Sequence, residues 1–119
     1  MSHSNRLDKL KNALSGKMSA KRKIDSLNEL AWLERYDATK EAIDFAGQAL
    51  KLASQNRYRK GIAYARLYKA VGLYLITSEP ALVKEFLDVQ EYFEKHQNES
   101  GLTICLRYLA LVNESIGNF

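Results

Sequence analysis

The chain lacks most of the residues that build covalent or metal-centred sites. Its 119 residues include one cysteine, Cys105, and two histidines, His3 and His96, which stand far apart. A single cysteine excludes an intramolecular disulfide and any zinc site built on a cysteine pair. The histidines do not follow metal-ligand spacing. The sequence therefore predicts no metal site, and the hydrophobic neighbours of Cys105 indicate a buried thiol rather than a nucleophile.

Long apolar runs and glycine-rich motifs are also absent. No hydrophobic stretch approaches the roughly 20 residues of a membrane-spanning helix, and the polar start MSHSNRLDK lacks the apolar segment of a signal peptide. We therefore expect a cytoplasmic protein. The six glycines are scattered singly, so there is no phosphate-binding loop, nucleophile elbow or dinucleotide fingerprint. We expect no cofactor, no catalytic residue and a protein that is not an enzyme.

The positive charge is concentrated near the N-terminus. Residues 1–23 carry seven Lys and Arg against one Asp, whereas residues 24–119 have a small excess of acidic residues. Clustered cations attract phosphate groups or an acidic partner, although they also occur on solvated helix starts. One alternative function is therefore a nucleic-acid-binding module that uses Lys17, Lys21, Arg22 and Lys23 together with Arg57, Arg59 and Lys60.

Apolar residues recur three and four positions apart along almost the whole chain, as in Ala42, Ala46 and Ala49. This spacing gathers them on one face of a helix, and no stretch alternates with the period of a half-buried strand. We therefore predict an all-α fold of about six helices. Their expected bounds are about 5–14, 20–36, 38–54, 60–76, 80–95 and 101–116, with N-caps from Ser19, Asp37 and Ser78 and with Pro80 in the first turn of the fifth helix.

A repeat of about 40 residues organises these helices. Gly61-Ile62-Ala63 and Gly101-Leu102-Thr103 open equivalent helices, Tyr68 matches Tyr108, Ala70 matches Ala110, and Ala31 lies 39 residues before Ala70. Repeats of two antiparallel helices stack into a solenoid with a continuous core. We expect a basic N-terminal helix and linker at 1–19, repeats at about 20–58 and 59–98, and a truncated repeat at 99–119.

These residues resemble the tetratricopeptide repeat (TPR). Leu30-Ala31 matches the large–small pair of its first helix, Ala42, Ala46 and Ala49 match the small residues of its second, and Gly117-Asn118-Phe119 matches its closing turn. The resemblance covers about residues 20–119 and implies antiparallel pairs stacked as a right-handed αα-superhelix. The middle repeat departs from the pattern, with Leu82, Phe86 and Val89 in place of small residues and Thr77-Ser78-Glu79-Pro80 in place of the Gly-Asp turn.

The resemblance implies a protein–protein interaction or scaffolding module whose concave groove binds a polypeptide. The long repeats and the segment Leu27–Trp32 look like the N-terminal regulatory region of longer bacterial signalling proteins, so we expect such a parent protein. By register, the groove receives Asn28, Trp32, Arg35, Tyr36, Tyr64, Tyr74, Arg107 and Leu111, and also Asp25, Leu67, Val71, Leu75, Ile104, Glu114 and Ser115. Four of these residues could instead belong to the hydrophobic core between adjacent helices and not to the groove: Tyr64, Leu67, Val71 and Leu75.

The last helix suggests a further alternative. The sequence stops where the next helix of a repeat would follow, so we expect the apolar face of the last helix, with Leu109 and Val112, to lack its covering neighbour. Exposed apolar patches tend to find partners. The alternative function is therefore a structural segment that dimerises through Leu109 and Val112.

Overall fold

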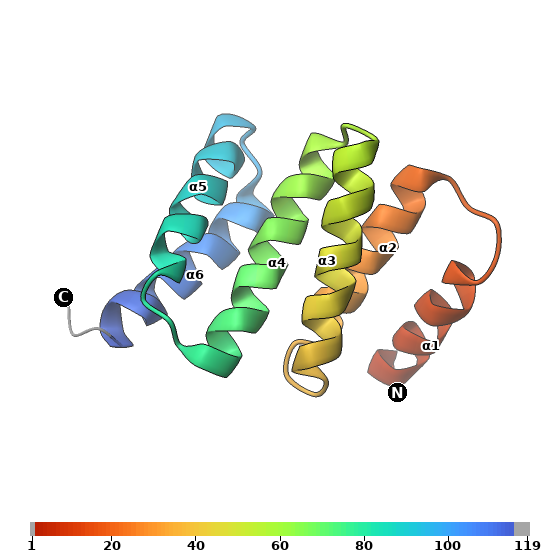
Figure 1. Ribbon diagram of the computed structural model, residues 1–119, viewed down its shortest axis with the longest axis horizontal. Coiled ribbons are helices and arrows are strands. Elements are labelled where there is room, and N and C mark those ends of the chain that lie inside the picture. Colours follow the sequence, from red (N-terminus) through yellow and green to blue (C-terminus); the bar gives the residue numbers. More distant parts are fainter. Residues whose placement is uncertain (1, 116–119) are drawn as a thin grey trace.

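The computed structural model describes residues 2–115, with side chains described for residues 5–114. These residues form six α-helices and no β-strand (Figure 1). The helices are α1 (Ser2–Leu14), α2 (Ala20–Leu33), α3 (Thr39–Gln55), α4 (Arg59–Thr77), α5 (Leu82–Lys95) and α6 (Glu99–Ser115). The prediction of an all-α fold with six helices is confirmed.

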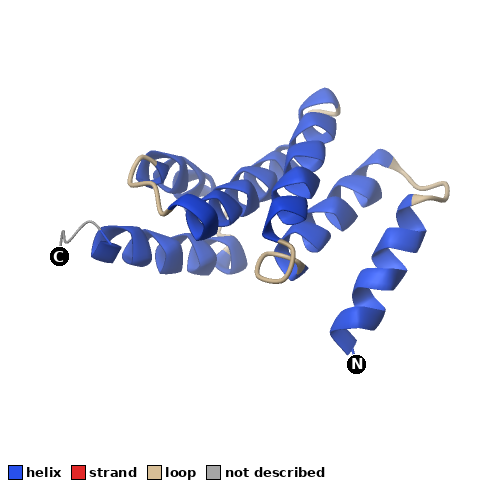
Figure 2. Ribbon diagram, turned by 60° about the horizontal axis from the view of Figure 1, so that its bottom comes forward, coloured by secondary structure: helices blue, strands red, loops and turns tan. Residues whose placement is uncertain are grey.

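Successive helices run in alternating directions, and each packs against the next along the chain (Figures 1 and 2). In addition, α4 contacts both α2 and α6, so these three helices lie side by side in chain order. Helices α3 and α5 lie in front of α2 and α6 in Figure 1, and within the described chain they do not contact each other. The molecule therefore has an α2–α4–α6 face and, opposite it, a gap between α3 and α5 that is floored by α4.

The core has two parts that are packed differently. Between α2, α3 and α4, small side chains allow close helix approach, and Ala46, Ala49 and Ala53 are fully buried. Between α4, α5 and α6, large side chains fill the space instead, including Phe86, Phe93 and Tyr108. The departure of the middle repeat from the small-residue pattern is therefore a real difference in packing, because α5 fills its interface with aromatic rings.

The turns that follow α3 and α5 have the same structure 40 residues apart. The backbone is left-handed at Arg57, with φ 54°, and at Gln97, with φ 52°. In each turn the next amide donates to the carbonyl five residues earlier at 2.9 Å, from Tyr58 to Ala53 and from Asn98 to Phe93. This is the hydrogen-bond pattern that commonly ends helices. The turn geometry therefore recurs at the 40-residue spacing found in the sequence.

Only one of the three predicted N-caps is confirmed. The Ser19 hydroxyl oxygen accepts a hydrogen bond from the Arg22 amide at 3.2 Å. The Asp37 cap is wrong, because α3 starts after Ala38 and has no side-chain cap bond. Helix α2 also stops earlier than predicted, at Leu33, since the Arg35 amide makes a tighter turn bond to the Trp32 carbonyl.

The predicted Ser78 cap of α5 is also wrong. Ser78 instead ends α4, with a left-handed backbone (φ 54°) and an amide that donates to the Tyr74 carbonyl at 2.8 Å. The Thr77 hydroxyl oxygen accepts the Glu79 amide at 3.2 Å, which turns the chain before a new helix can start. Pro80 consequently lies in this turn, and α5 begins two residues later.

The predicted self-association face is wrong as well. Leu109 is 9% exposed and Val112 is fully buried, because both belong to the core cluster between α4, α5 and α6. Helices α4 and α5 cover the side of α6 that we expected to be exposed for lack of a following helix. The Gly117-Asn118-Phe119 turn lies outside the described residues. Among the helices of residues 2–115, none is long and apolar enough to cross a membrane.

Candidate functional site

The C-terminal end of α2 presents an arginine between two aromatic rings. The Arg35 guanidinium lies 3.5 Å from the centroid of the Trp32 ring and 4.5 Å from that of Tyr36. It also donates to the Trp32 carbonyl at 2.6 Å, which holds the side chain back along the helix. Tyr36 is 61% exposed. This Trp–Arg–Tyr cluster is therefore a preorganised, partly exposed surface of the residue types that anchor interfaces.

Two tyrosines of α4 continue this aromatic surface across the α2–α4–α6 face. Tyr68 stacks on Trp32 with ring centroids 5.2 Å apart, and Tyr64 lies 5.6 Å from Tyr68. The Tyr64 hydroxyl donates to the Asn98 side chain at 3.0 Å, which ties the row to the turn before α6. Burial raises the pKa of Tyr68 well above its usual value, so its phenol stays protonated.

A shallow pocket of about 260 Å³ opens beside this aromatic row. Asn28 lies in its wall with only 5% of its surface exposed. The Asn28 amide group donates to the Gly61 carbonyl at 3.2 Å, but its Oδ1 has no hydrogen-bond partner among the described residues. A buried acceptor without a partner costs stability. The pocket itself is lined by Asp25, Asn28, Glu29, Lys60, Tyr64, Tyr68 and Ser100.

The other end of the face joins the α2 cluster to α6. Interaction with the Tyr108 hydroxyl is the largest of the effects that lower the pKa of Tyr36, and the charges of Arg35 and Arg107 act in the same direction. Burial, followed by the Tyr36 interaction, raises the pKa of Tyr108 to about 12. Two cations thus face a polar tyrosine pair, an environment that favours a carboxylate or a main-chain carbonyl of a ligand.

The structure brings most of the predicted groove residues together on one face. Asn28, Trp32, Arg35, Tyr36 and Tyr64 lie in or beside the pocket and the Trp–Arg–Tyr cluster. The Tyr74 hydroxyl donates to the Leu111 carbonyl at 3.2 Å, so these two predicted residues also meet. Arg107 is exposed and acts on Tyr36 through its charge. The face therefore extends from the start of α2 to the last turns of α6.

Two predicted groove residues belong to the core instead. Leu67 and Val71 are fully buried in the cluster between α4, α5 and α6. Of the two alternatives for these residues, groove or core, the structure shows the core. Tyr64 and Leu75 are partly buried and pack against the same cluster. The reason is that α4 packs against both α5 and α6, which together cover the side of α4 that carries Leu67 and Val71.

Sequence reasoning used Tyr68 and Tyr108 as repeat markers and missed their place in the site. Tyr68 follows Tyr64 by four residues and therefore shares its helix face, a spacing that could have identified it. Tyr108 could not have been identified in this way, since its side chain is only 1% exposed and its role depends on the approach of Tyr36 from another helix pair.

The chemistry of this face is that of recognition. Within the described residues there is no group of three His, Cys, Asp or Glu side chains that could hold a metal ion. The groups that converge are aromatic rings, arginines and the pocket carboxylates of Asp25 and Glu29, which bind by stacking, charge and hydrogen bonding. No protein-family model, curated protein or solved structure matches this chain.

Proposed function

We propose that this protein is an interaction module that binds a peptide segment of a partner protein across its α2–α4–α6 face. The observation that carries this proposal is the exposed Trp–Arg–Tyr cluster of Trp32, Arg35 and Tyr36, which continues into the tyrosine row of α4. Trp, Tyr and Arg supply most of the binding energy at protein interfaces, because they bury a large area and keep a directional polar end.

The pocket beside the row supports a peptide as the ligand. A peptide main chain carries N–H donors at regular intervals, and the carboxylates of Asp25 and Glu29 in the pocket wall are acceptors for them. An aromatic or aliphatic side chain of the peptide then packs on Trp32 and Tyr68. Its main-chain carbonyls face Arg35 and Arg107. One extended strand satisfies all three kinds of group at once.

The repeat architecture supports the same proposal. Helix pairs that recur every 40 residues, with the same turn hydrogen bonds, are expected for a TPR-like superhelix. In such an arrangement the first helices of successive repeats line one continuous surface, which here is the α2–α4–α6 face. A place in the N-terminal regulatory part of a longer bacterial signalling protein remains a prediction from the sequence resemblance.

The test is selection of peptides from a random library on the immobilised protein, followed by measurement of their dissociation constants by fluorescence anisotropy. Replacing an interface anchor costs about 2 kcal/mol, which is about a thirtyfold loss of affinity. We expect losses of this order for Trp32→Ala and Tyr36→Ala. Tyr36→Ala is the cleaner variant, since Tyr36 is 61% exposed, whereas Trp32 is stacked on the Tyr68 ring.

The matched control is Lys51→Ala, because Lys51 is an exposed residue of α3, away from the α2–α4–α6 face. Peptide affinity should be the same for this variant and for the wild type. If the selected peptides bind Tyr36→Ala and Trp32→Ala as tightly as the wild type, their binding site lies elsewhere and the proposal is refuted. Failure to select any peptide would count against it equally.

A further inference from the structure

A second pocket lies on the opposite side of α4 from the aromatic row. It has a volume of about 430 Å³ and opens at the end of the gap between α3 and α5, next to the turn that joins α3 to α4. Its floor is apolar and its rim is cationic. The lining residues are Ser54, Arg57, Arg59, Ile62, Ala63, Arg66, Asp88, Val89 and Tyr92. We call this the arginine pocket.

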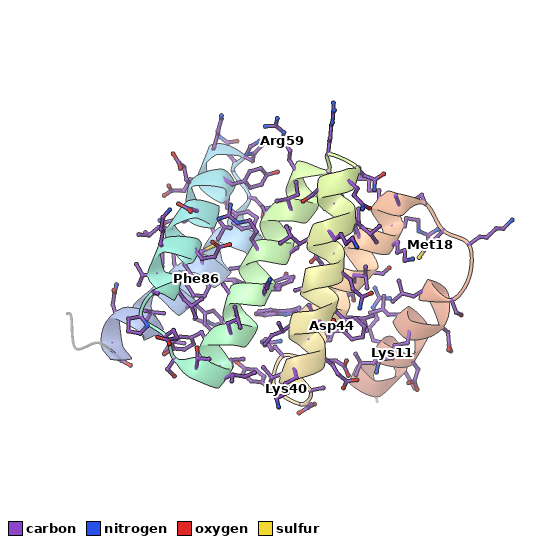
Figure 3. All side chains as sticks on the ribbon, in the orientation of Figure 1. Lys11, Met18, Lys40, Asp44, Arg59 and Phe86 are labelled. Carbon is purple, nitrogen blue, oxygen red and sulfur yellow. The ribbon has the colours of Figure 1, made fainter. Side chains whose placement is uncertain are left out.

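The three arginines of this pocket differ in their partners. Arg66 forms ion pairs with Glu85 at 2.7 Å and with Asp88 at 3.4 Å, and the Glu85 hydrogen bond is the main cause of its raised pKa. Arg57 and Arg59 are exposed, and neither pairs with a carboxylate of residues 5–114. Figure 3 shows Arg59 at the edge of the molecule where this turn lies. Two charges therefore remain available at the pocket mouth.

Other charges near the two arginines largely offset one another. Lys21, at the start of α2, lies over the Tyr58 ring at 5.2 Å, and the hydroxyl of the same tyrosine donates to the Asp25 carboxylate at 2.8 Å. Lys60 lines the pocket on the other side of α4. The positive potential at the mouth of the arginine pocket therefore comes from Arg57 and Arg59.

Arg57 also occupies a backbone position that an arginine does not favour. Its φ of 54° lies in the left-handed region, where glycine is the preferred residue after a helix. The turn hydrogen bond from the Tyr58 amide to the Ala53 carbonyl holds this conformation. The Arg57 side chain thus projects from a fixed backbone, so less conformational entropy is lost when it binds an anion.

The second wall of the pocket decides which anion fits. Helix α5 contributes Asp88, Val89 and Tyr92 to the pocket. The Asp88 carboxylate repels a second anionic group placed beside the first, so a chain of closely spaced phosphates fits less well than one carboxylate. A single carboxylate can contact the two arginines while a neighbouring apolar group covers Ile62, Val89 and the Tyr92 ring.

We propose that the arginine pocket binds an acidic peptide segment of a partner protein, with one carboxylate between Arg57 and Arg59 and a neighbouring apolar side chain on the pocket floor. This site lies on the other side of α4 from the α2–α4–α6 face and is independent of the peptide bound there. The protein then has two recognition surfaces, one aromatic and one cationic.

The probe is the fluorescein-labelled peptide Gly-Glu-Leu-Phe-Gly-Ser, which carries one acidic side chain, compared with the same peptide carrying Gln in place of that Glu. We expect the acidic peptide to bind the wild-type protein at least about tenfold more tightly, as charge-assisted hydrogen bonds to arginine provide, with an affinity that falls as salt is added. Arg57→Gly should weaken its binding about tenfold without lowering Tm, because glycine suits the left-handed turn.

The structural repeat supplies a matched control. Gln97→Gly makes the same backbone change in the equivalent turn, where φ is 52°, and should leave the affinity for the acidic peptide unchanged. Tyr36→Ala should also leave it unchanged, which separates this site from the proposed function. Equal binding of the acidic and neutral peptides, or wild-type affinity in Arg57→Gly, would overturn the inference. Tighter binding of a short single strand of deoxythymidine than of the acidic peptide would also overturn it, in favour of nucleic acid.

Discussion

Replacing Gly101 by alanine should destabilise the protein, although alanine is the better helix former. Gly101 lies in the first turn of α6 and is buried against the ring of Phe93, which is itself fully buried. A Cβ atom at this position would come closer than 3.0 Å to three carbon atoms of that ring. A buried aromatic ring cannot move away without disturbing its own neighbours.

The magnitude follows from two opposing effects. Overpacking a filled core costs about 1–3 kcal/mol, whereas replacing glycine by alanine within a helix gains at most about 1 kcal/mol. The net expectation for Gly101→Ala is a loss of about 1–2 kcal/mol, or about 4–8 °C in Tm for a chain of this size. Gly47→Ala is the matched control, since nothing lies within 4 Å of a Cβ atom there. It should stabilise the protein by up to about 1 kcal/mol.

Urea and thermal unfolding followed by circular dichroism measure both changes. If the clash with the ring is the cause, the cost of Gly101→Ala should shrink in a Phe93→Leu background, where the side chain is smaller and more adaptable. A neutral or stabilising Gly101→Ala would refute the packing of α6 on α5 described above. An equal cost in both backgrounds would show that Phe93 is not responsible.

Three further predictions concern side-chain chemistry. Burial raises the pKa of the Cys105 thiol to about 12, so a thiol reagent at pH 8 should modify it slowly in the native protein and rapidly in denaturant. Burial and the hydrogen bond to Asp25 raise the pKa of Tyr58 to about 12 from its usual 10. The folded state therefore favours the protonated phenol, and the unfolding free energy should fall as the pH rises from 10 to 12. Over the same pH range, the unfolding free energy of Tyr58→Phe should fall less than that of the wild type. Arg66→Gln breaks the partly exposed ion pair with Glu85 and should cost about 0.5–1 kcal/mol at low salt and less at high salt, as measured by urea unfolding.

The two peptide sites would make different demands on a partner. The aromatic face offers stacking, two arginines and the carboxylates of the adjoining pocket, so it suits a segment with an aromatic anchor and an exposed main chain. The arginine pocket offers two unpaired charges over an apolar floor. Since the two surfaces lie on opposite sides of α4, one partner could engage both only by passing around the edge of the molecule, whereas two partners could bind at once.

The sequence by itself determined the helical class, the number of helices and the 40-residue repeat. These follow from apolar spacing and from glycine positions, which are local properties that each segment carries with it. It also placed Trp32, Arg35 and Tyr36 on one surface, because three residues within a single helical turn and the loop after it stay together whatever the tertiary packing. Their interpretation as a binding site depended on residue type rather than on contacts.

Tertiary structure alone decided which sides of α4 and α6 are buried. Leu67, Val71, Leu109 and Val112 have the same apolar character as surface residues of an interface, and only the packing of α5 against both helices places them in the core. The ends of α2 at Leu33 and of α4 at Thr77 were likewise decided in the folded chain, by the turn bond from the Arg35 amide to the Trp32 carbonyl and by the left-handed backbone of Ser78. The Asn28 oxygen has no hydrogen-bond partner, and Arg57 and Arg59 have no carboxylate partner, because no suitable group of the folded chain lies close enough to them. The local sequence pattern cannot predict this.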